Sequence, residues 1–166
     1  MGLLDFLGKG SSGGLSVDET LLAQVYDERL QLSPGAEAML AGFKAAGAIT
    51  ALVSGGFTFF TERLRTRLGL DVAISNTLAV AHGRLTGEIA GGIVDAQVKA
   101  DTVRALAAKH NGDRGLTVVL GDGANDLPMF AAADVSIAYR AKPVVRAKAT
   151  HTLDYSGLDG ALNLFR

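Results

Sequence analysis

The sequence has no cysteine and no tryptophan, and only three of its 166 residues are proline. Without cysteine there can be no disulfide bonds or thiolate metal sites, which fits a reducing compartment. No apolar run approaches the roughly 20 residues that a membrane-spanning helix needs, and the amino end lacks a basic region followed by a long apolar stretch. We therefore expect a cytoplasmic protein that is neither secreted nor inserted in a membrane.

Neither sign of charge is in excess, because 16 Lys and Arg stand against 17 Asp and Glu. This balance gives an overall field too weak to attract nucleic acid or an anionic membrane, so neither is expected as a partner. Apolar residues make up 48% of the chain, which is enough for the packed core of one ordinary domain.

Glycine is abundant, with 21 residues. Most stand at the ends of apolar segments, where turns between strands and helices need them. Residues 8–14 instead form one low-complexity stretch, Gly-Lys-Gly-Ser-Ser-Gly-Gly, which is typical of a flexible linker. We expect residues 1–14 to be a short apolar peptide and linker, separate from the rest.

The spacing of apolar residues predicts alternating helices and strands. Helices are expected at residues 17–30, 33–46, 57–68, 96–110, 125–132 and 143–148. Strands are expected at residues 49–53, 116–120, 135–138 and 150–153, with a β-hairpin at 78–80 and 85–89. This alternation is typical of a doubly wound, parallel α/β sheet, in which ligands bind beyond the carboxyl ends of the strands.

The first strand end that carries polar groups is Val53-Ser54-Gly55-Gly56. A hydroxyl and glycine amides at the start of a helix could hold a phosphate oxygen. The same residues also suit a simple Ser-Gly turn that joins a strand to a helix. The residues alone leave both interpretations open.

The second is Leu120-Gly121-Asp122-Gly123-Ala124-Asn125-Asp126, with two carboxylates and a carboxamide on a glycine-rich turn. Hard oxygen ligands at a strand end suit Mg²⁺, which takes one or two carboxylates, several waters and a substrate phosphate. The alternative is a solvated acidic turn in which Asn125 or Asp126 caps the next helix.

Other candidates receive plainer interpretations. Lys99 lies on the helix at 96–110, where a lysine is by default a charge facing solvent. Phe57, Phe59 and Phe60 are expected to pack a helix against the sheet. The three histidines are too scattered to predict a metal site.

Three motifs together resemble the second, third and fourth motifs of bacterial phosphoserine phosphatases of the haloacid dehalogenase superfamily. They are Val53-Ser54-Gly55-Gly56-Phe57, Asp95-Ala96-Gln97-Val98-Lys99 and Gly121-Asp122-Gly123-Ala124-Asn125-Asp126-Leu127. The flanking segment Asn76-Thr77-Leu78 is similar too, and the resemblance covers about residues 17–165. It implies a Rossmann-like core and Mg²⁺-dependent hydrolysis of O-phosphoserine to serine and phosphate, in serine biosynthesis.

The resemblance also implies a role for each residue of these motifs. Ser54 and the amide of Gly55 would bind the transferring phosphoryl group, and Lys99 would neutralise its oxygens. Asp122 would be a direct Mg²⁺ ligand. Asn125 would contact the phosphate or the serine moiety, and Asp126 would position Lys99 and a metal-bound water.

The family's first motif, an apolar strand followed by Asp-x-Asp-x-Thr, occurs nowhere in this sequence. In the family, the first of those aspartates attacks phosphorus and the second is the general acid and base. Asp5 is the only early candidate, and Leu7 stands where the second aspartate should be. Because removing a covalent nucleophile costs many orders of magnitude in rate, we expect negligible hydrolysis by this chain alone.

Most of the helical cap that follows the first motif in the family is also absent. We expect residues 15–32 to be a remnant cap helix and residues 33–166 to form a truncated core domain. A second hypothesis is a non-catalytic module that binds Mg²⁺ and phosphate, or an oligomerising scaffold derived from the same fold.

The missing strand is the central one of the family's sheet, between the strands at 49–53 and 116–120. Three arrangements are open: the two strands close on each other, residues 1–7 partly fill the gap, or another chain supplies a strand. The last would make the protein a homo-oligomer or a complex with a complementing chain.

Overall fold

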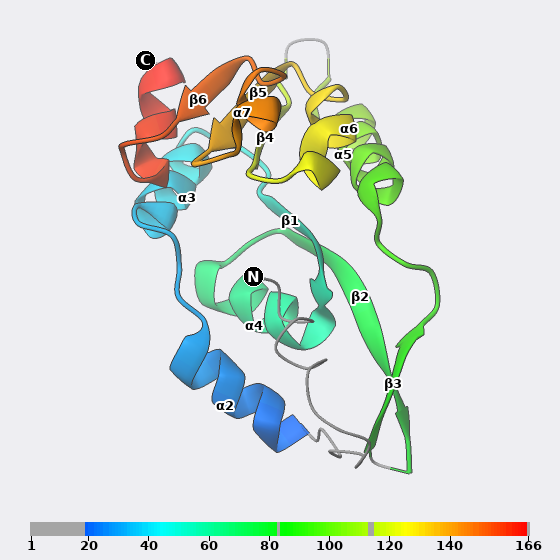
Figure 1. Ribbon diagram of the computed structural model, residues 1–166. Coiled ribbons are helices and arrows are strands. Elements are labelled where there is room, and N and C mark those ends of the chain that lie inside the picture. The colour runs from blue at the N-terminus through cyan, green and yellow to red at the C-terminus, as the bar shows by residue number, and fades with distance from the viewer. Residues whose placement is uncertain (1–18, 83, 113–114, 166) are drawn as a thin grey trace.

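The structure is a computed structural model that describes residues 19–82, 84–112 and 115–165. Its helices are α2 (Glu19–Arg29), α3 (Ala36–Ala45), α4 (Thr58–Leu68), α5 (Ala96–His110), α6 (Leu127–Phe130) and α7 (Pro143–Arg146), with 3-10 turns η1 (Ala124–Asp126) and η2 (Leu158–Phe165). Its strands are β1 (Ala51–Phe57), β2 (Val72–Ala81), β3 (Arg84–Ala90), β4 (Val118–Gly121), β5 (Val135–Tyr139) and β6 (His151–Leu153) (Figure 1). No helix in these ranges is long and apolar enough to cross a membrane.

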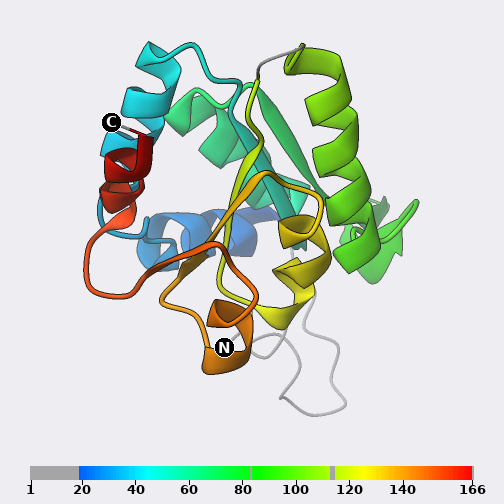
Figure 2. The same cartoon turned by 90° about the horizontal axis from the view of Figure 1, so that it is seen from above.

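The strands form two sheets of three, in the orders β1-β2-β3 and β4-β5-β6. β1 runs parallel to β2, and β4, β5 and β6 are all parallel, whereas β2 and β3 pair antiparallel as a hairpin. Helices lie on both sides of the parallel strands, with α3 and η2 on one side and α5 and α6 on the other (Figure 2). The predicted α/β class with a mainly parallel sheet is therefore confirmed.

β2 is much longer than the strand expected at residues 78–80. Its first part pairs with β1, so that Val72 lies opposite Ala51 and Ile74 opposite Val53. Its second part pairs with β3. The apolar pattern did not predict the first part, because the polar residues Ser75 and Asn76 interrupt it. The pairing with β1 shows that these residues nevertheless belong to a strand.

The hydrophobic core consists of three clusters. Val103 of α5 and Phe130 of α6 pack with β4 and β5 in the first, and Ile137 of β5 packs with α3 and η2 in another. In the remaining cluster, Phe57 and Phe60 pack against Leu22 of α2. The predicted role of the phenylalanines in packing is thus confirmed.

A glycine ends α3, and a long-range contact stabilises the end of α4. α3 ends before Gly47, whose positive φ of 80° suits glycine at a helix end, as predicted. Lys44 of α3 donates hydrogen bonds to the carbonyls of Leu68 (3.0 Å) and Gly69, at the carboxyl end of α4. A cation at that end complements the helix dipole, so this contact stabilises α4 and joins the two helices.

β1 and β4 belong to different sheets, so the two strands do not close on each other by pairing. Both run in the same direction, from the top of Figure 2 towards the bottom. Their carboxyl ends therefore point to the same edge of the molecule. The prediction that residues 1–7 partly fill the gap between them falls outside the described residues.

Candidate functional site

Ser54, Gly55 and Gly56 lie inside strand β1, not on a turn after it. The carboxyl end of the strand predicted at 49–53 was wrong, because β1 continues to Phe57 and α4 begins only at Thr58. The register with β2 is irregular between Val53 and Phe57, so the backbone leaves the regular ladder at the serine and two glycines. The amide of Gly56 donates to Ser54 Oγ (3.0 Å), which leaves the serine O–H free to donate elsewhere.

Asn76 of β2 joins this irregular segment to the start of α5. Its Nδ2 donates to the carbonyl of Gly55 (2.8 Å), and its Oδ1 accepts from the amide of Val94 (2.7 Å). The side chain is only 4% exposed, so these bonds satisfy a buried carboxamide. From the sequence, Asn76 was identified only as part of the flanking segment Asn76-Thr77-Leu78. The signal that could have revealed its role is a carboxamide between two apolar stretches, because such a polar group needs partners when it is buried.

The start of α5 was predicted correctly, and so was its end. The Asp95 side chain accepts from the amide of Val98 (2.8 Å) as an N-cap. The buried face of this helix carries Lys99, Ala100 and Val103, whereas Val98 is exposed. The default interpretation of Lys99 as a solvent-facing charge was therefore wrong.

Lys99 forms a buried ion pair with Asp126. Its Nζ lies 2.8 Å from Asp126 Oδ1, and each side chain is 8% exposed. A buried charge is retained only when it is paired and hydrogen-bonded, because the interior solvates it poorly. This pair fixes α5 against the turn that follows β4.

The other carboxylate oxygen of Asp126 holds that turn in shape. Asp126 Oδ2 accepts hydrogen bonds from the amides of Asp122 and Gly123, each at 3.2 Å. A Cβ added at Gly121 would lie 2.5 Å from the same oxygen, so only glycine fits there. The turn was expected to lead into a helix at 125–132, but the structure has the short η1 followed by α6.

Asp122 and Asn125 are exposed on this turn. The carboxylate of Asp122 forms no hydrogen bond with another described residue, which leaves it available to a cation, and a carboxylate oxygen is the ligand type that Mg²⁺ prefers. Within the described ranges no group of three or more His, Cys, Asp and Glu side chains could hold a metal. Asp122 therefore fits Mg²⁺ as one protein ligand. The remaining ligands of the cation would be oxygens from other groups, such as water or phosphate.

The structure thus connects the predicted residues through a series of contacts. Asn76 links the backbone beside Ser54 to the start of α5, and Lys99 links α5 to the turn that carries Asp122. This series of contacts begins within β1, at Ser54 and Gly55, and ends on the turn after β4. His82, His110 and His151 are exposed and form no metal site in the described part of the chain.

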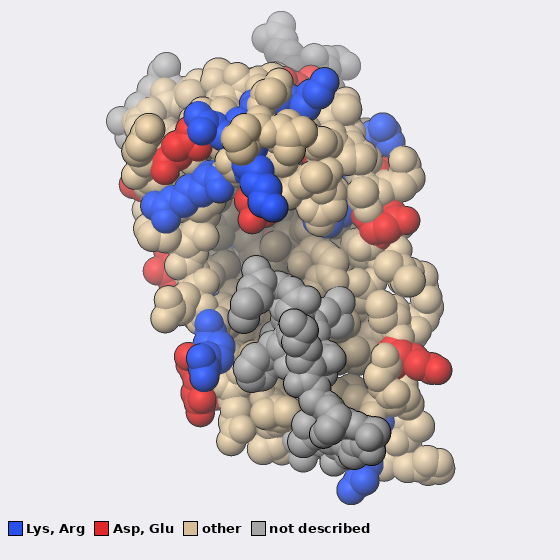
Figure 3. Space-filling model, viewed as in Figure 1, with Lys and Arg blue, Asp and Glu red and all other residues tan. Residues whose placement is uncertain are grey.

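A basic segment follows β5, with exposed side chains at Arg140, Lys142, Arg146 and Lys148. Figure 3 shows Lys and Arg gathered in the upper half of the face it displays, beside a hollow in the surface. Arg146 is partly neutralised by Asp154, at 2.7 Å. A local positive region favours an anionic ligand even though the whole chain carries a net charge of −1.

Comparison with known proteins gives consistent results. Residues 14–131 match the haloacid dehalogenase-like hydrolase family. The chain is 45% identical over 144 residues to phosphoserine phosphatase from Vibrio cholerae, covering 87% of this chain and 44% of the relative. It is 46% identical over 129 residues to phosphoserine phosphatase from Idiomarina loihiensis, covering 78% and 59%. The chain therefore spans about half the length of these curated relatives.

Solved structures of phosphoserine phosphatases are also similar to this chain. A probable phosphoserine phosphatase from Vibrio cholerae, in unliganded form, matches with a TM-score of 0.82 at 43% identity, covering 89% of this chain and 45% of that one. A phospho-aspartyl intermediate analogue of phosphoserine phosphatase matches with a TM-score of 0.81 at 32% identity, covering 90% and 71%. By sequence and by fold, the chain belongs to the phosphoserine phosphatase family of the haloacid dehalogenase-like hydrolases.

Proposed function

We propose that this chain carries the phosphoryl-binding and charge-neutralising part of a Mg²⁺-dependent phosphoserine phosphatase. The observation that supports this most directly is the buried Lys99–Asp126 pair beside the turn that bears Asp122. Burial of a lysine in an ion pair is unfavourable unless geometry and extra hydrogen bonds compensate, so a role beyond stability accounts for it best.

Ser54 would bind a phosphoryl oxygen through its hydroxyl. Because the Gly56 amide already donates to Ser54 Oγ, the serine proton is free to point at an anion. The amide of Gly55 would contribute a second donor. Asn76 would act as a positioning residue by holding the Gly55 carbonyl.

Lys99 would neutralise the charge that develops on the phosphoryl oxygens, which is the largest protein contribution in most phosphoryl transfers. One of its three N–H donors is used by Asp126, which keeps the ammonium group oriented. Asp126 would therefore act through Lys99 and through the backbone of the turn. Asn125 would contact the phosphate or the serine moiety from the exposed side of the turn.

Asp122 would be the ligand that this chain contributes to Mg²⁺. When bound, the cation would screen the negative charge of a phosphate monoester. Asp122 extends from the turn whose backbone Asp126 holds, so its position and that of Lys99 depend on the same Asp126 carboxylate.

The chain alone is expected to release no phosphate from O-phosphoserine above background, because the Asp-x-Asp-x-Thr motif is absent from its sequence. Serine biosynthesis remains the proposed setting of the whole enzyme. Ordinary turnover of O-phosphoserine by the purified chain in Mg²⁺ would contradict this expectation.

Calorimetry with inorganic phosphate in the presence of Mg²⁺ tests the binding part of the proposal. The wild-type chain should bind phosphate, and Ser54→Ala, Lys99→Met and Asp122→Ala should each weaken binding. Lys109→Met, which alters an exposed lysine on the same helix, is the matched control and should bind like the wild type. The proposal fails if the wild type does not bind, or if Asp122→Ala and Lys99→Met bind undiminished.

A further inference from the structure

Two basic residues follow the carboxyl end of β5, beside the turn that carries Asp122. The parallel register places Gly121, the last residue of β4, opposite Ala138. Asp122 follows Gly121 directly, and Arg140 comes two residues after Ala138. Because neighbouring strands lie only ~4.8 Å apart, the proposed Mg²⁺ ligand and the first residues after β5 share one edge of the sheet. Arg140 and Lys142 together are called the cationic rim here.

The backbone holds Arg140 in an uncommon conformation. Its φ is 46°, in the left-handed region that glycine tolerates and other residues rarely adopt. The Arg140 amide donates to the carbonyl of Leu153 in β6 (2.9 Å), and its Cζ lies 5.2 Å from the centre of the Tyr139 ring. Such strain persists only where the surrounding structure imposes it, and it is concentrated at functional sites. The fold thus keeps a guanidinium group at a position where glycine would be less strained.

Lys142 is also held by its backbone, at the start of α7. Its carbonyl accepts hydrogen bonds from the amides of Val145 (2.9 Å) and Arg146 (3.1 Å). The side chain of Val145 is only 1% exposed and packs in the core, which anchors this short helix. Both members of the cationic rim therefore start from fixed backbone positions, although their side chains reach the surface.

The protein does not neutralise the charges of the cationic rim. Both side chains are exposed, and neither forms an ion pair among the residues that the structure describes. Arg146 of the same segment is instead paired with Asp154 at 2.7 Å. α7 lies in the upper half of Figure 1, where the same view in Figure 3 shows Lys and Arg gathered beside a hollow. These free charges favour an anion at this edge of the sheet.

The neighbouring site needs such charges if it is to accept a phosphate dianion. The buried Lys99–Asp126 pair is neutral as a whole, so Asp122 gives the turn a formal charge of −1. That charge repels a phosphate monoester, which is dianionic above its second pKa of about 6. Arg140 and Lys142 change the formal charge of this edge to +1.

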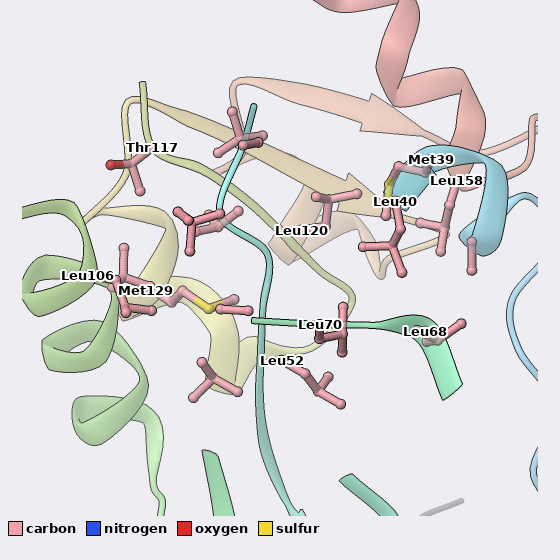
Figure 4. A pocket seen from close by; sticks show the side chains of 18 of the residues that line it. Met39, Leu40, Leu52, Leu68, Leu70, Leu106, Thr117, Leu120, Met129 and Leu158 are labelled. Carbon is pink, nitrogen blue, oxygen red and sulfur yellow. The ribbon is translucent and has the colours of Figure 1, made fainter. Parts of the chain in front are cut away.

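The apolar interior offers no alternative place for such an anion. A cavity of about 720 Å³ is lined by residues of β1, β4 and the helices around them, among them Leu52, Leu120 and Met129 (Figure 4). Neither Lys nor Arg contributes to this lining in the described part of the chain. Because an apolar environment solvates an anion poorly, phosphate is favoured at the open edge beside the cationic rim.

We propose that the cationic rim draws phosphate and phosphate monoesters to the site beside Asp122 through its electric field, without contacting them. This inference rests on the proposed function, because it requires an anion site formed by Ser54 and Lys99. An effect exerted over a distance depends on the charge of the ligand and is screened by salt. A residue that contacts the ligand, or that only supports the fold, would keep its effect in high salt.

The salt dependence of phosphate binding tests this inference on the full chain. Calorimetry with inorganic phosphate and Mg²⁺ would be done at ionic strengths of ~0.01 M and ~1 M, where charges are screened beyond ~30 Å and ~3 Å. In low salt, Arg140→Gln/Lys142→Met should bind about five- to tenfold more weakly than the wild type. In high salt the two proteins should bind equally. The charge-reversed variant Arg140→Glu/Lys142→Glu should bind more weakly still, but again only in low salt.

Lys148→Met is the matched control on the same segment. Lys148 is exposed, but the Thr150 amide donates to Ser136 Oγ and His151 lies opposite Ile137, so Lys148 lies towards the amino end of β5. Its replacement should weaken binding in low salt by less than about twofold. Circular dichroism checks that each variant is folded.

Three results would overturn the inference. The first is that the neutral double variant binds phosphate like the wild type in low salt. The second is that it loses the same factor in both salts, which would mean that these residues contact phosphate or shape the site. In both cases the wild type still binds phosphate, so the proposed function stands. The third is that the wild type does not bind phosphate at all, and this result alone would overturn the proposed function as well.

Discussion

The ammonium group of Lys99 lies 2.8 Å from Oδ1 of Asp126, and both side chains are almost completely buried. These residues are 27 positions apart in the sequence, so their contact joins α5 to the turn after β4. The pair matters for stability as well as for the proposed chemistry, because removing one partner leaves the other charge buried without compensation.

Lys99→Met should lower the free energy of unfolding by about 3–5 kcal/mol, since it leaves the Asp126 carboxylate buried and unpaired. Urea denaturation measures the effect. Lys109→Met should change stability by less than about 0.5 kcal/mol, as expected for an exposed position. In the double variant Lys99→Met/Asp126→Asn, part of the loss should be recovered because no unpaired charge remains. Equal stability of Lys99→Met and Lys109→Met would contradict the buried pair.

Gly121→Ala should destabilise the chain by about 1–3 kcal/mol, the usual cost of forcing a methyl group into a packed position. The added Cβ would meet Asp126 Oδ2 at 2.5 Å and displace the carboxylate that holds the turn. Gly92→Ala is the matched control, because nothing lies within 4 Å of a Cβ at that position. Thermal unfolding measures the stability of both variants. Equal unfolding temperatures for Gly121→Ala and Gly92→Ala would argue against the close approach of Gly121 to Asp126.

Asn76→Leu should cost about 1–3 kcal/mol, because it leaves the buried amide of Val94 without its acceptor. Hydrogen exchange gives a local measurement: the Val94 amide should exchange faster than in the wild type. Thr77→Ala changes the exposed neighbour on the same strand and should leave that amide protected. Unchanged exchange at Val94 in Asn76→Leu would show that the asparagine does not hold the start of α5.

Acid should remove the stabilisation that Asp71 provides. Hydrogen bonds from the backbone and then the side chain of Thr50 lower the pKa of Asp71 below its ordinary value of 3.8. A lowered pKa in the folded state means stability that is present above the unfolded pKa and is lost as the pH falls through the folded pKa. The wild type should therefore be more stable than Asp71→Asn at neutral pH. The difference should begin to shrink near the ordinary value of 3.8 and should be lost only at the still lower pH where folded Asp71 takes up its proton.

Denaturant titrations of both proteins across this pH range measure the difference. Thr50→Val removes the hydroxyl donor but keeps the backbone donor, so it should reduce the pH dependence without abolishing it. A difference between wild type and Asp71→Asn that stays constant from neutral to acidic pH would contradict the predicted effect.

Some of the fold could be read directly from local signals. The helix α5 runs from Ala96 to His110, as predicted, since its Asp95 cap and its apolar spacing lie within a few residues of each other. The same holds for the end of α3 before Gly47. Strand ends were less accurate: β1 passes through Ser54 to Phe57, because its backbone continues beside β2 rather than turning at the glycines.

The sequence by itself determined the alternation of strands and helices, the family motifs and the absence of Asp-x-Asp-x-Thr, because these depend on residue order and on contacts within a few positions. Only the tertiary structure decided that Asn76 forms hydrogen bonds with Gly55 and Val94, which lie 21 and 18 positions away in the sequence. It also decided that Lys99 is buried against Asp126, and that β1 and β4 belong to separate sheets. Such contacts join residues far apart in the chain, and no local propensity or spacing encodes which of them form.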